Sequence, residues 1–257
     1  MTQKERLEQI RSTIKMNERV VVSALSKQFN VTEETIRRDL EKLESEGLVT
    51  RTYGGAILNS RHTSIRVSYS QRTQTNVTEK RAIAQIVADL IPKHKIVVGS
   101  DSSSTVFEAV KLLKNNGNLL LMTYAADILQ ELADAEMRIM STGGLLNKRS
   151  HALQGVIARN TIKSYNMDIF LVSCKGLSLS GGIFDSDEDE VEIKQIMAEK
   201  ASQVILLADH TKFDCVAFAK LLDFDQINTI VTDRKPSSEW TDLFASHHVE
   251  LLFPPES

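Results

Sequence analysis

The spacing of apolar positions at the start of the chain predicts two helices. Apolar side chains recur at intervals of three and four at Leu7, Ile10 and Ile14, which places them on one face of a first helix. Leu25 and Phe29, four residues apart, mark the buried side of a short second helix. Each helix therefore has an apolar stripe that a neighbouring element must cover.

A third helix and a small hairpin are predicted next. Thr32 is a suitable N-cap, and the two acidic residues after it suit the positive end of the helix dipole. Ile36 and Leu40 line the buried face, and Gly47 ends the helix. A strand-like stretch and the turn Gly54–Gly55 follow. Two helices, a turn, a helix and a hairpin are typical of a winged helix-turn-helix.

The pattern changes after a polar stretch without periodicity, residues 59–77, which we interpret as a linker between a domain at 1–58 and a domain at 78–257. The second domain contains near-continuous apolar runs at residues 96–99, 119–123, 137–141, 168–173, 204–209 and 227–233. Helix-like segments separate several of these runs. Apolar strands that alternate with helices indicate an α/β domain whose mostly parallel sheet is covered on both faces.

Composition and charge narrow the class of protein. Of 257 residues, 42% are hydrophobic and 25% charged, as in globular proteins. We expect a cytoplasmic protein, because no apolar run is long enough to span a bilayer and the N-terminus lacks a signal-peptide core. Residues 1–81 carry 15 Lys/Arg against 10 Asp/Glu, whereas residues 82–257 carry 16 against 24. A basic front end on an acidic body indicates that the front end binds a polyanion.

The third helix carries the candidate DNA-reading side chains. With Ile36 turned inward, Thr35, Arg37 and Arg38 lie on the flanks and outer face of the helix segment that enters a major groove. Guanidinium groups there bind phosphates or guanine edges. The predicted DNA-contacting residues are Ser23, Thr32, Glu33, Thr35, Arg37, Arg38, Arg51 and Tyr53. The alternative is a pair of solvated arginines bonded to Glu33, Glu34, Asp39 or Glu41.

The run from Arg6 to Ala56, which ends in TIRRDLEKLESEGLVTRTYGGA, resembles the N-terminal domain of the DeoR family of bacterial repressors. The resemblance continues through most of the chain. Members of this family carry a C-terminal sensor domain related to sugar-phosphate isomerases such as ribose-5-phosphate isomerase. The resemblance therefore implies a Rossmann-like α/β domain that binds a small phosphorylated sugar as effector.

A hydroxyl-rich segment at a predicted strand end is the candidate effector loop. Its residues are Asp101, Ser102, Ser103, Ser104 and Thr105. Hydroxyls and backbone N–H groups that open a helix suit a phosphate, and the carboxylate suits sugar hydroxyls. An ordinary Ser/Thr-rich helix cap is the alternative. The family resemblance adds, as further effector-binding positions, Thr123, Gly143, Gly144, Lys148, Arg149, Lys175, Asp209 and Lys212.

The chain departs from the family pattern at three places. Ser103 replaces a glycine that would allow close backbone approach to a phosphate, Tyr124 replaces an asparagine, and Thr211 replaces a serine. A similar serine-type loop occurs in the fucose-operon branch of the family. The resemblance to that branch favours a ketose 1-phosphate as the effector.

We expect no metal and no cofactor. The acidic run Asp185–Glu190 lacks the spacing of a calcium loop and is interpreted as a solvated turn before a helix. The histidines lack metal-ligand spacing and are interpreted as surface or capping residues. Cys174 and Cys215 are interpreted as reduced thiols. The sequence contains neither a Walker loop nor a dinucleotide fingerprint.

Three functions are compatible with these patterns. The first is a repressor of a sugar-catabolism operon, not an enzyme, that binds repeated half-sites in operator DNA as a homo-oligomer, either a dimer or a tetramer. The second is an isomerase-like enzyme fused to a winged-helix module, for which Asp101, Glu192 and Asp209 are the available general bases. The third is a protein-interaction module, which the arginine pair and the basic linker disfavour. The sequence favours the repressor.

Overall fold

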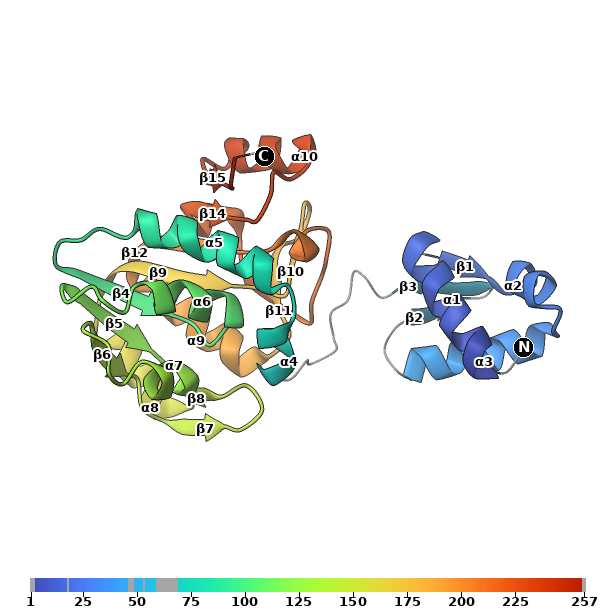
Figure 1. Ribbon diagram of the computed structural model, residues 1–257, viewed down its shortest axis with the longest axis horizontal. Helices are drawn as coiled ribbons and strands as arrows, with labels where there is room; N and C mark the ends of the chain where they lie inside the picture. Colours follow the sequence, from blue (N-terminus) through green and yellow to red (C-terminus); the bar gives the residue numbers. More distant parts are fainter. Residues whose placement is uncertain (1–2, 18, 46–48, 53, 59–68, 256–257) are drawn as a thin grey trace. The chain divides into compact units, whose positions relative to one another are not determined.

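The computed structural model describes residues 3–17, 19–45, 49–52, 54–58 and 69–255. The chain forms two compact units, Met1–Ile65 and Arg66–Ser257, drawn in Figure 1 in blue and in teal to red, respectively. Each unit has its own hydrophobic core. The predicted fold class, a winged helix-turn-helix followed by an α/β domain, is confirmed.

The first unit contains the three predicted helices and a three-stranded antiparallel sheet in the order β1-β3-β2. Its elements are α1 (Gln3–Asn17), β1 (Arg19–Val21), α2 (Val22–Phe29), α3 (Glu33–Ser45), β2 (Val49–Thr52) and β3 (Gly55–Leu58). The predicted apolar stripes meet in one core that contains Leu7, Ile10, Ile14, Leu25, Ile36, Leu40 and Leu43. Strand β1 has only three residues and was not predicted, whereas Gly47 lies outside the described residues.

A buried ion pair joins α1 to α3. Arg6 Nε lies 2.5 Å from Asp39 Oδ2, and both side chains are almost inaccessible to solvent. Asp39 is therefore turned away from Arg37 and Arg38, which leaves those arginines on the opposite face of α3. The pair orients the outer face of this helix.

The second unit is built on a seven-stranded parallel sheet in the order β15-β14-β12-β9-β4-β5-β6. The strands are β4 (Ile96–Ser100), β5 (Leu119–Thr123), β6 (Arg138–Ser141), β9 (Met167–Ser173), β12 (Ala201–Leu207), β14 (Thr229–Val231) and β15 (Glu250–Leu252). Six of the seven correspond to the predicted apolar runs. The exception is β15, a three-residue edge strand.

Helices cover both faces of this sheet, as the continuous apolar strands require. One face packs against α5 (Val77–Leu90), α6 (Ser104–Leu112) and α7 (Ala126–Glu131). The other packs against α8 (Val156–Lys163), α9 (Glu188–Glu199) and α10 (Ser238–Ser246). Consecutive residues of β9 alternate between the two cores, so both cores draw on the same central strand.

The strand order reverses between β4 and β9. From β4 the chain adds β5 and β6 on one side, and from β9 it adds β12, β14 and β15 on the other. Ligands of open α/β sheets bind in the crevice outside the carboxyl ends of the strands at such a reversal. Short antiparallel elements stand near this edge: β7 (Leu145–Asn147), β8 (Ala152–Gln154), β10 (Gly176–Ser178), β11 (Gly182–Asp185) and β13 (Ala219–Leu222).

Part of the predicted linker belongs to the second unit. Helix α4 (Tyr69–Gln74) packs against α6, and the Tyr69 ring stacks on His151 with ring centroids 5.4 Å apart. Lys80 Nζ donates hydrogen bonds to the carbonyl oxygens of Arg72 and Thr75. The polar, aperiodic sequence did not reveal these contacts, because α4 is short and is held by a few side chains.

We expect a fragment that starts at Tyr69 to be more stable than one that starts at Thr78. The shorter fragment loses the Tyr69–His151 stacking and the carbonyl acceptors of Lys80, together worth at least about 1 kcal/mol. Thermal unfolding should therefore show a midpoint lower by about 2–4 °C or more for residues 78–257. Equal midpoints would show that α4 adds nothing to the folded unit.

Candidate functional site

Helix α3 presents its predicted DNA-reading side chains to solvent. Thr32 caps the helix as predicted: its Oγ1 accepts a hydrogen bond from Thr35 N at 3.2 Å and lies 2.9 Å from Thr35 Oγ1. The side chains of Arg37 and Arg38 are 52% and 75% exposed. Both arginines are therefore accessible to a DNA backbone or to base edges.

In the absence of DNA these arginines bond to acidic residues of the same helix. Arg37 Nη2 lies 2.9 Å from Glu33 Oε2, and Arg38 Nε lies 3.5 Å from Glu34 Oε1. Exposed pairs of this kind contribute about 0–1 kcal/mol, so an incoming phosphate can replace them. The structure is thus compatible with both the DNA-contact and the solvated interpretation.

The structure describes the side chains of two of the four remaining residues that were predicted to contact DNA. Ser23 is exposed on α2, and Glu33 is exposed at the start of α3. Arg51 lies in β2, but its side chain is not among the described groups. Tyr53 lies outside the described residues.

In the second unit, Asp101 is buried at the carboxyl end of β4, and both of its oxygens have partners. Oδ1 accepts a hydrogen bond from Ser103 N at 2.8 Å, and Oδ2 accepts one from Ser173 N at 2.9 Å. Lys194 Nζ lies 3.0 Å from Oδ2. Asp101 thus joins the ends of β4 and β9 at the reversal of strand order.

Lys194, on α9, is the buried cation at the centre of this region. Its ammonium group also contacts Asp185 Oδ2 at 2.6 Å and the Ser173 carbonyl oxygen at 2.8 Å. Burial alone would lower the pKa of Lys194, but Asp101 and Asp185 raise it well above its ordinary value. The lysine stays charged. Sequence reasoning missed it, because a lysine on an amphipathic helix usually reaches solvent.

The serine side chains of the predicted effector loop mostly form hydrogen bonds within the protein. Ser103 caps α6, since its Oγ accepts a hydrogen bond from Val106 N at 3.2 Å. Ser102 Oγ donates to Glu190 Oε2 at 3.1 Å, and Ser104 Oγ donates to the Arg72 carbonyl oxygen at 3.3 Å. The helix-cap alternative therefore describes Ser103, and the loop as a whole is buried.

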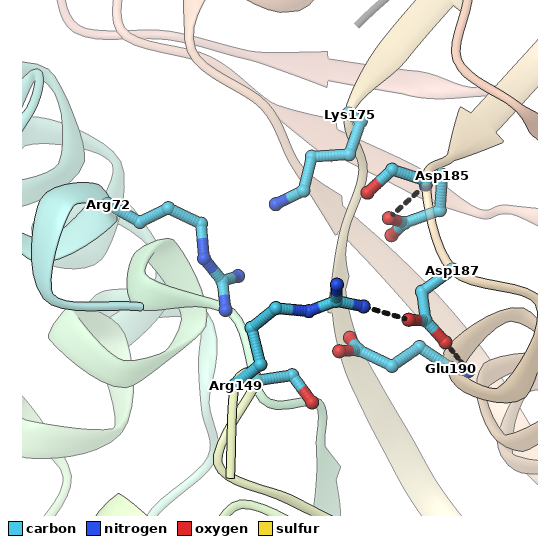
Figure 2. Close-up of a pocket in the computed structure, with 8 residues that line it drawn as sticks. Arg72, Arg149, Lys175, Asp185, Asp187 and Glu190 are labelled. Carbon is cyan, nitrogen blue, oxygen red and sulfur yellow. Dashed lines mark hydrogen bonds and ion pairs between the residues drawn. The ribbon is translucent and has the colours of Figure 1, made fainter. Parts of the chain in front are cut away.

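A cavity lies beside this loop, and Figure 2 shows its lining. The cavity is small, with a volume of about 30 Å³, and it opens to solvent. Its lining residues are Arg72, Arg149, Ser150, Lys175, Asp185, Ser186, Asp187 and Glu190. They come from α4, the connection between β7 and β8, the end of β9, and the segment from β11 into α9. Arg149 and Lys175 were predicted as effector ligands, whereas the other six were not.

Three cations from separate elements converge on the cavity. Arg72, Arg149 and Lys175 point toward the same space in Figure 2. Burial and the charges of Arg72, Lys194 and Lys212 together lower the pKa of Lys175 to about 8, against the opposing effect of Asp185. Like charges held this close favour an anion between them.

Carboxylates form the opposing wall, and the interpretation of residues 185–190 as a solvated turn before a helix holds only in part, since Glu188 and Asp189 are exposed at the start of α9. Asp185 is 2% exposed and Glu190 is 7% exposed. Burial raises the pKa of Glu190, whereas Lys194 and Lys175 lower the pKa of Asp185 against the effect of its burial. Asp187 caps α9, and its Oδ2 lies 3.5 Å from Arg149 Nη2. The sequence does not distinguish this buried acidic wall from an exposed one.

The remaining predicted effector positions do not line the cavity. Thr123 Oγ1 donates to the Ser100 carbonyl oxygen at 3.3 Å and is buried. Gly143 and Gly144 have positive φ angles, and a Cβ at Gly144 would lie 2.4 Å from the Gln154 carbonyl oxygen. Close packing against β8 therefore explains that glycine. The other positions outside the lining are Thr105, Lys148, Asp209 and Lys212.

Asp209 caps the short 3₁₀ helix η2 (His210–Lys212), and Lys212 is its last residue. Asp209 Oδ1 accepts hydrogen bonds from Thr211 and from Asn76 Nδ2, the latter at 3.3 Å.

No group of three or more His, Cys, Asp or Glu side chains among the described residues is arranged to hold a metal ion. Nor does any described helix have the length and apolar character needed to cross a membrane.

Comparison with known proteins gives matches over both units. A DeoR-like helix-turn-helix domain matches residues 6–62, and a DeoR C-terminal sensor domain matches residues 75–234. The HTH-type transcriptional repressor GlcR of Bacillus subtilis is 35% identical over 98% of this chain and 96% of its own length. The L-fucose operon activator of Haemophilus influenzae is 30% identical over 83% and 85%, respectively.

Among solved structures, ribose 5-phosphate isomerase A from Methanocaldococcus jannaschii matches 54% of this chain and 55% of its own, with a TM-score of 0.40 and 14% identity.

We expect Lys194→Met to destabilise the second unit strongly. The substitution leaves Asp101 and Asp185 buried without their counter-ion, which costs about 3–5 kcal/mol. Urea unfolding measures this loss. The control is Lys220→Met, which removes an exposed partner of Asp223 and should cost about 1 kcal/mol or less. Equal losses in the two variants would contradict a structural role for the buried lysine.

Proposed function

Because the chain belongs to the DeoR family of DNA-binding transcriptional regulators, we propose that it represses a sugar-catabolism operon and responds to a small phosphorylated sugar. The observation that carries this proposal is the division of the cavity into a cationic and a carboxylate wall. The name of the L-fucose operon activator supports a sugar operon as the target.

The cationic wall suits the phosphate group of the ligand. Two guanidinium groups and one ammonium group, from Arg72, Arg149 and Lys175, supply charge-assisted hydrogen bonds that are stronger than neutral ones. The second unit is acidic as a whole, so an anion needs such a local concentration of positive charge. In this proposal Arg149 and Lys175 keep their predicted role, and Arg72 replaces Lys212 as the third cation.

The carboxylate wall suits the sugar hydroxyls. Asp185, Asp187 and Glu190 accept hydrogen bonds from hydroxyl groups, whereas they repel a bare phosphate ion. Ser150 Oγ is buried at the cavity and has no hydrogen-bond partner among the described residues, and a ligand oxygen would provide one. A molecule with one anionic end and several hydroxyls satisfies both walls, and a ketose 1-phosphate is such a molecule.

The positions of the candidate general bases support a sensor rather than an enzyme. Asp101 is fully buried and bonded to Lys194, and Glu192 is paired with Arg159 at 2.9 Å. Neither of them lines the cavity, and Asp209 does not line it either. None of these three residues is therefore placed to take a proton from a sugar carbon in the cavity.

The proposed regulator works in the cytoplasm as a dimer or tetramer. Helix-turn-helix proteins read two-fold operators with two copies of the recognition helix, one for each half-site. In this chain α3 is the recognition helix, with Thr35, Arg37 and Arg38 as the proposed contacts.

We expect Arg38→Ala to weaken operator binding without loss of stability, because the side chain is 75% exposed. If Arg38 contacts a base, affinity should fall by about 5- to 150-fold at one base pair. If it contacts a phosphate, all sequences should weaken and the salt slope should fall by about one unit. Fluorescence anisotropy with a duplex selected from a random pool measures both.

Arg234→Ala is the matched control, since Arg234 is an exposed arginine of the second unit. It should bind the selected duplex as the unchanged protein does. Unchanged affinity and salt dependence in both Arg37→Ala and Arg38→Ala would rule out α3 as the recognition helix.

We further expect a phosphorylated sugar to bind more tightly than its free sugar or inorganic phosphate, and its affinity to fall above about pH 8. Lys175 has a pKa of about 8 in the free protein, so it loses its charge as the pH rises past that value. A bound phosphate favours the charged lysine, so the dissociation constant should rise by up to about tenfold per pH unit. The phosphate itself keeps its charge there, since its second pKa is about 6.

Calorimetry with fructose 1-phosphate, glucose 6-phosphate and glycerol 3-phosphate, beside fructose, glucose, glycerol and inorganic phosphate, tests this proposal. Lys175→Met should bind the tightest member more weakly, with a flat profile between about pH 7 and pH 9. Tighter binding of the free sugars, or no binding of any phosphorylated member, would contradict the proposed effector class.

A further inference from the structure

Helix α4 occupies a special place in the chain. It is the first described element after residues 59–68, which join the second unit to β3 of the DNA-binding unit. Helix α4 is therefore the described element of the second unit that is nearest in sequence to the DNA-binding unit. The same helix supplies Arg72 to the cavity.

A stacked aromatic ring and hydrogen bonds to backbone carbonyl oxygens hold α4 on the second unit. The Tyr69 ring stacks on His151, whose Nδ1 lies 3.0 Å from the carboxylate of Asp127. Lys80 Nζ donates to the carbonyl oxygens of Thr75, at 2.5 Å, and of Arg72. Ser104 Oγ approaches the Arg72 carbonyl oxygen at 3.3 Å. These contacts are few, as expected for an element of six residues.

The Arg72 side chain opposes this docking. It points toward Arg149 and Lys175 across the cavity, as Figure 2 shows, and its charge contributes to the lowered pKa of Lys175. Arg72 Nε is buried and has no hydrogen-bond partner among the described residues. Without a bound ligand, the half-buried Arg72 side chain therefore faces two like charges, although the cavity carboxylate of Glu190 attracts it.

We propose that α4 is the element through which the cavity ligand controls DNA binding, with Arg72 as the residue that senses the ligand. This inference rests on the proposed function of the cavity. A phosphate placed between Arg72, Arg149 and Lys175 turns their mutual repulsion into attraction and holds α4 in the docked position. In the absence of the phosphate, contacts such as those of Tyr69, Lys80 and Ser104 hold the helix without this added attraction.

The physical requirement for such control is met. A ligand shifts an equilibrium only by the difference between its affinities for the two states. Arg72 reaches the phosphate only while α4 is docked, so the docked state binds the ligand more tightly than a state with α4 released. Docking of α4 on the second unit is therefore coupled to binding of the ligand in the cavity.

Tyr69→Ala separates ligand binding from control, because it removes the stacking on His151 and leaves Arg149 and Lys175 in the cavity. The probe is the tightest-binding member of the calorimetric panel, at a concentration that calorimetry shows to be saturating for each variant. In the unchanged protein, the probe should alter operator affinity by about tenfold or more. In Tyr69→Ala it should alter operator affinity by less than about twofold at the same saturation.

Two matched variants and one local readout accompany this test. Tyr69→Phe keeps the stacked ring and should respond as the unchanged protein does. Tyr165→Ala removes an exposed tyrosine that follows α8 and should also respond normally. Hydrogen exchange of the amides of residues 69–75 should slow when the probe binds the unchanged protein.

A normal operator response in Tyr69→Ala, or exchange at residues 69–75 that the probe does not change, would overturn the role of α4. Absence of binding by every member of the panel would instead reject the proposed effector, so the two failures are distinguishable.

Discussion

The carboxyl ends of the central strands of the second unit depend on one buried ammonium group, that of Lys194. It lies within 3.0 Å of both Asp101 and Asp185, and it bonds to the backbone of β9. Removing three charges from water is costly, and only their mutual contacts offset that cost. The lysine therefore fixes α9, the ends of β4 and β9, and the end of β11 relative to one another. Five of the eight residues that line the cavity lie at or after the ends of β9 and β11: Lys175, Asp185, Ser186, Asp187 and Glu190.

This arrangement separates structural charges from those that face the ligand. Both carboxylate oxygens of Asp101 bond to buried groups of the protein. In contrast, Arg72, Arg149 and Lys175 line the cavity together with Asp187 and Glu190. A cavity with cations on one wall and carboxylates on the other selects a ligand by where its anionic and hydroxyl groups lie. The net charge of the ligand does not decide its affinity alone. Because one of the cations comes from α4, the same cavity connects recognition of the ligand to the chain that leads to the DNA-binding unit.

Sequence patterns predicted the two-unit architecture and most of its strands, since periodicity reports burial directly. They missed α4 and the three-residue strand β15, which are too short to show a period. At the site, the predictions placed the candidate loop at the correct end of β4 but assigned Asp101 to the ligand. The burial of Lys194 and of Glu190 involves contacts between residues far apart in the sequence, such as Lys194 with Asp101 and Ser102 with Glu190, the latter 88 positions apart. A local pattern contains no information about such contacts.

We propose that a phosphorylated sugar binds in the cavity, that operator DNA binds on α3, and that the affinities for these two ligands are coupled. Thermodynamic linkage requires each ligand to change the affinity of the other by the same factor. The most direct measurement is the calorimetric dissociation constant of the tightest sugar phosphate, with and without saturating operator duplex. The account predicts a change equal to that which the sugar phosphate produces in operator affinity. A dissociation constant that is the same with and without DNA would contradict it.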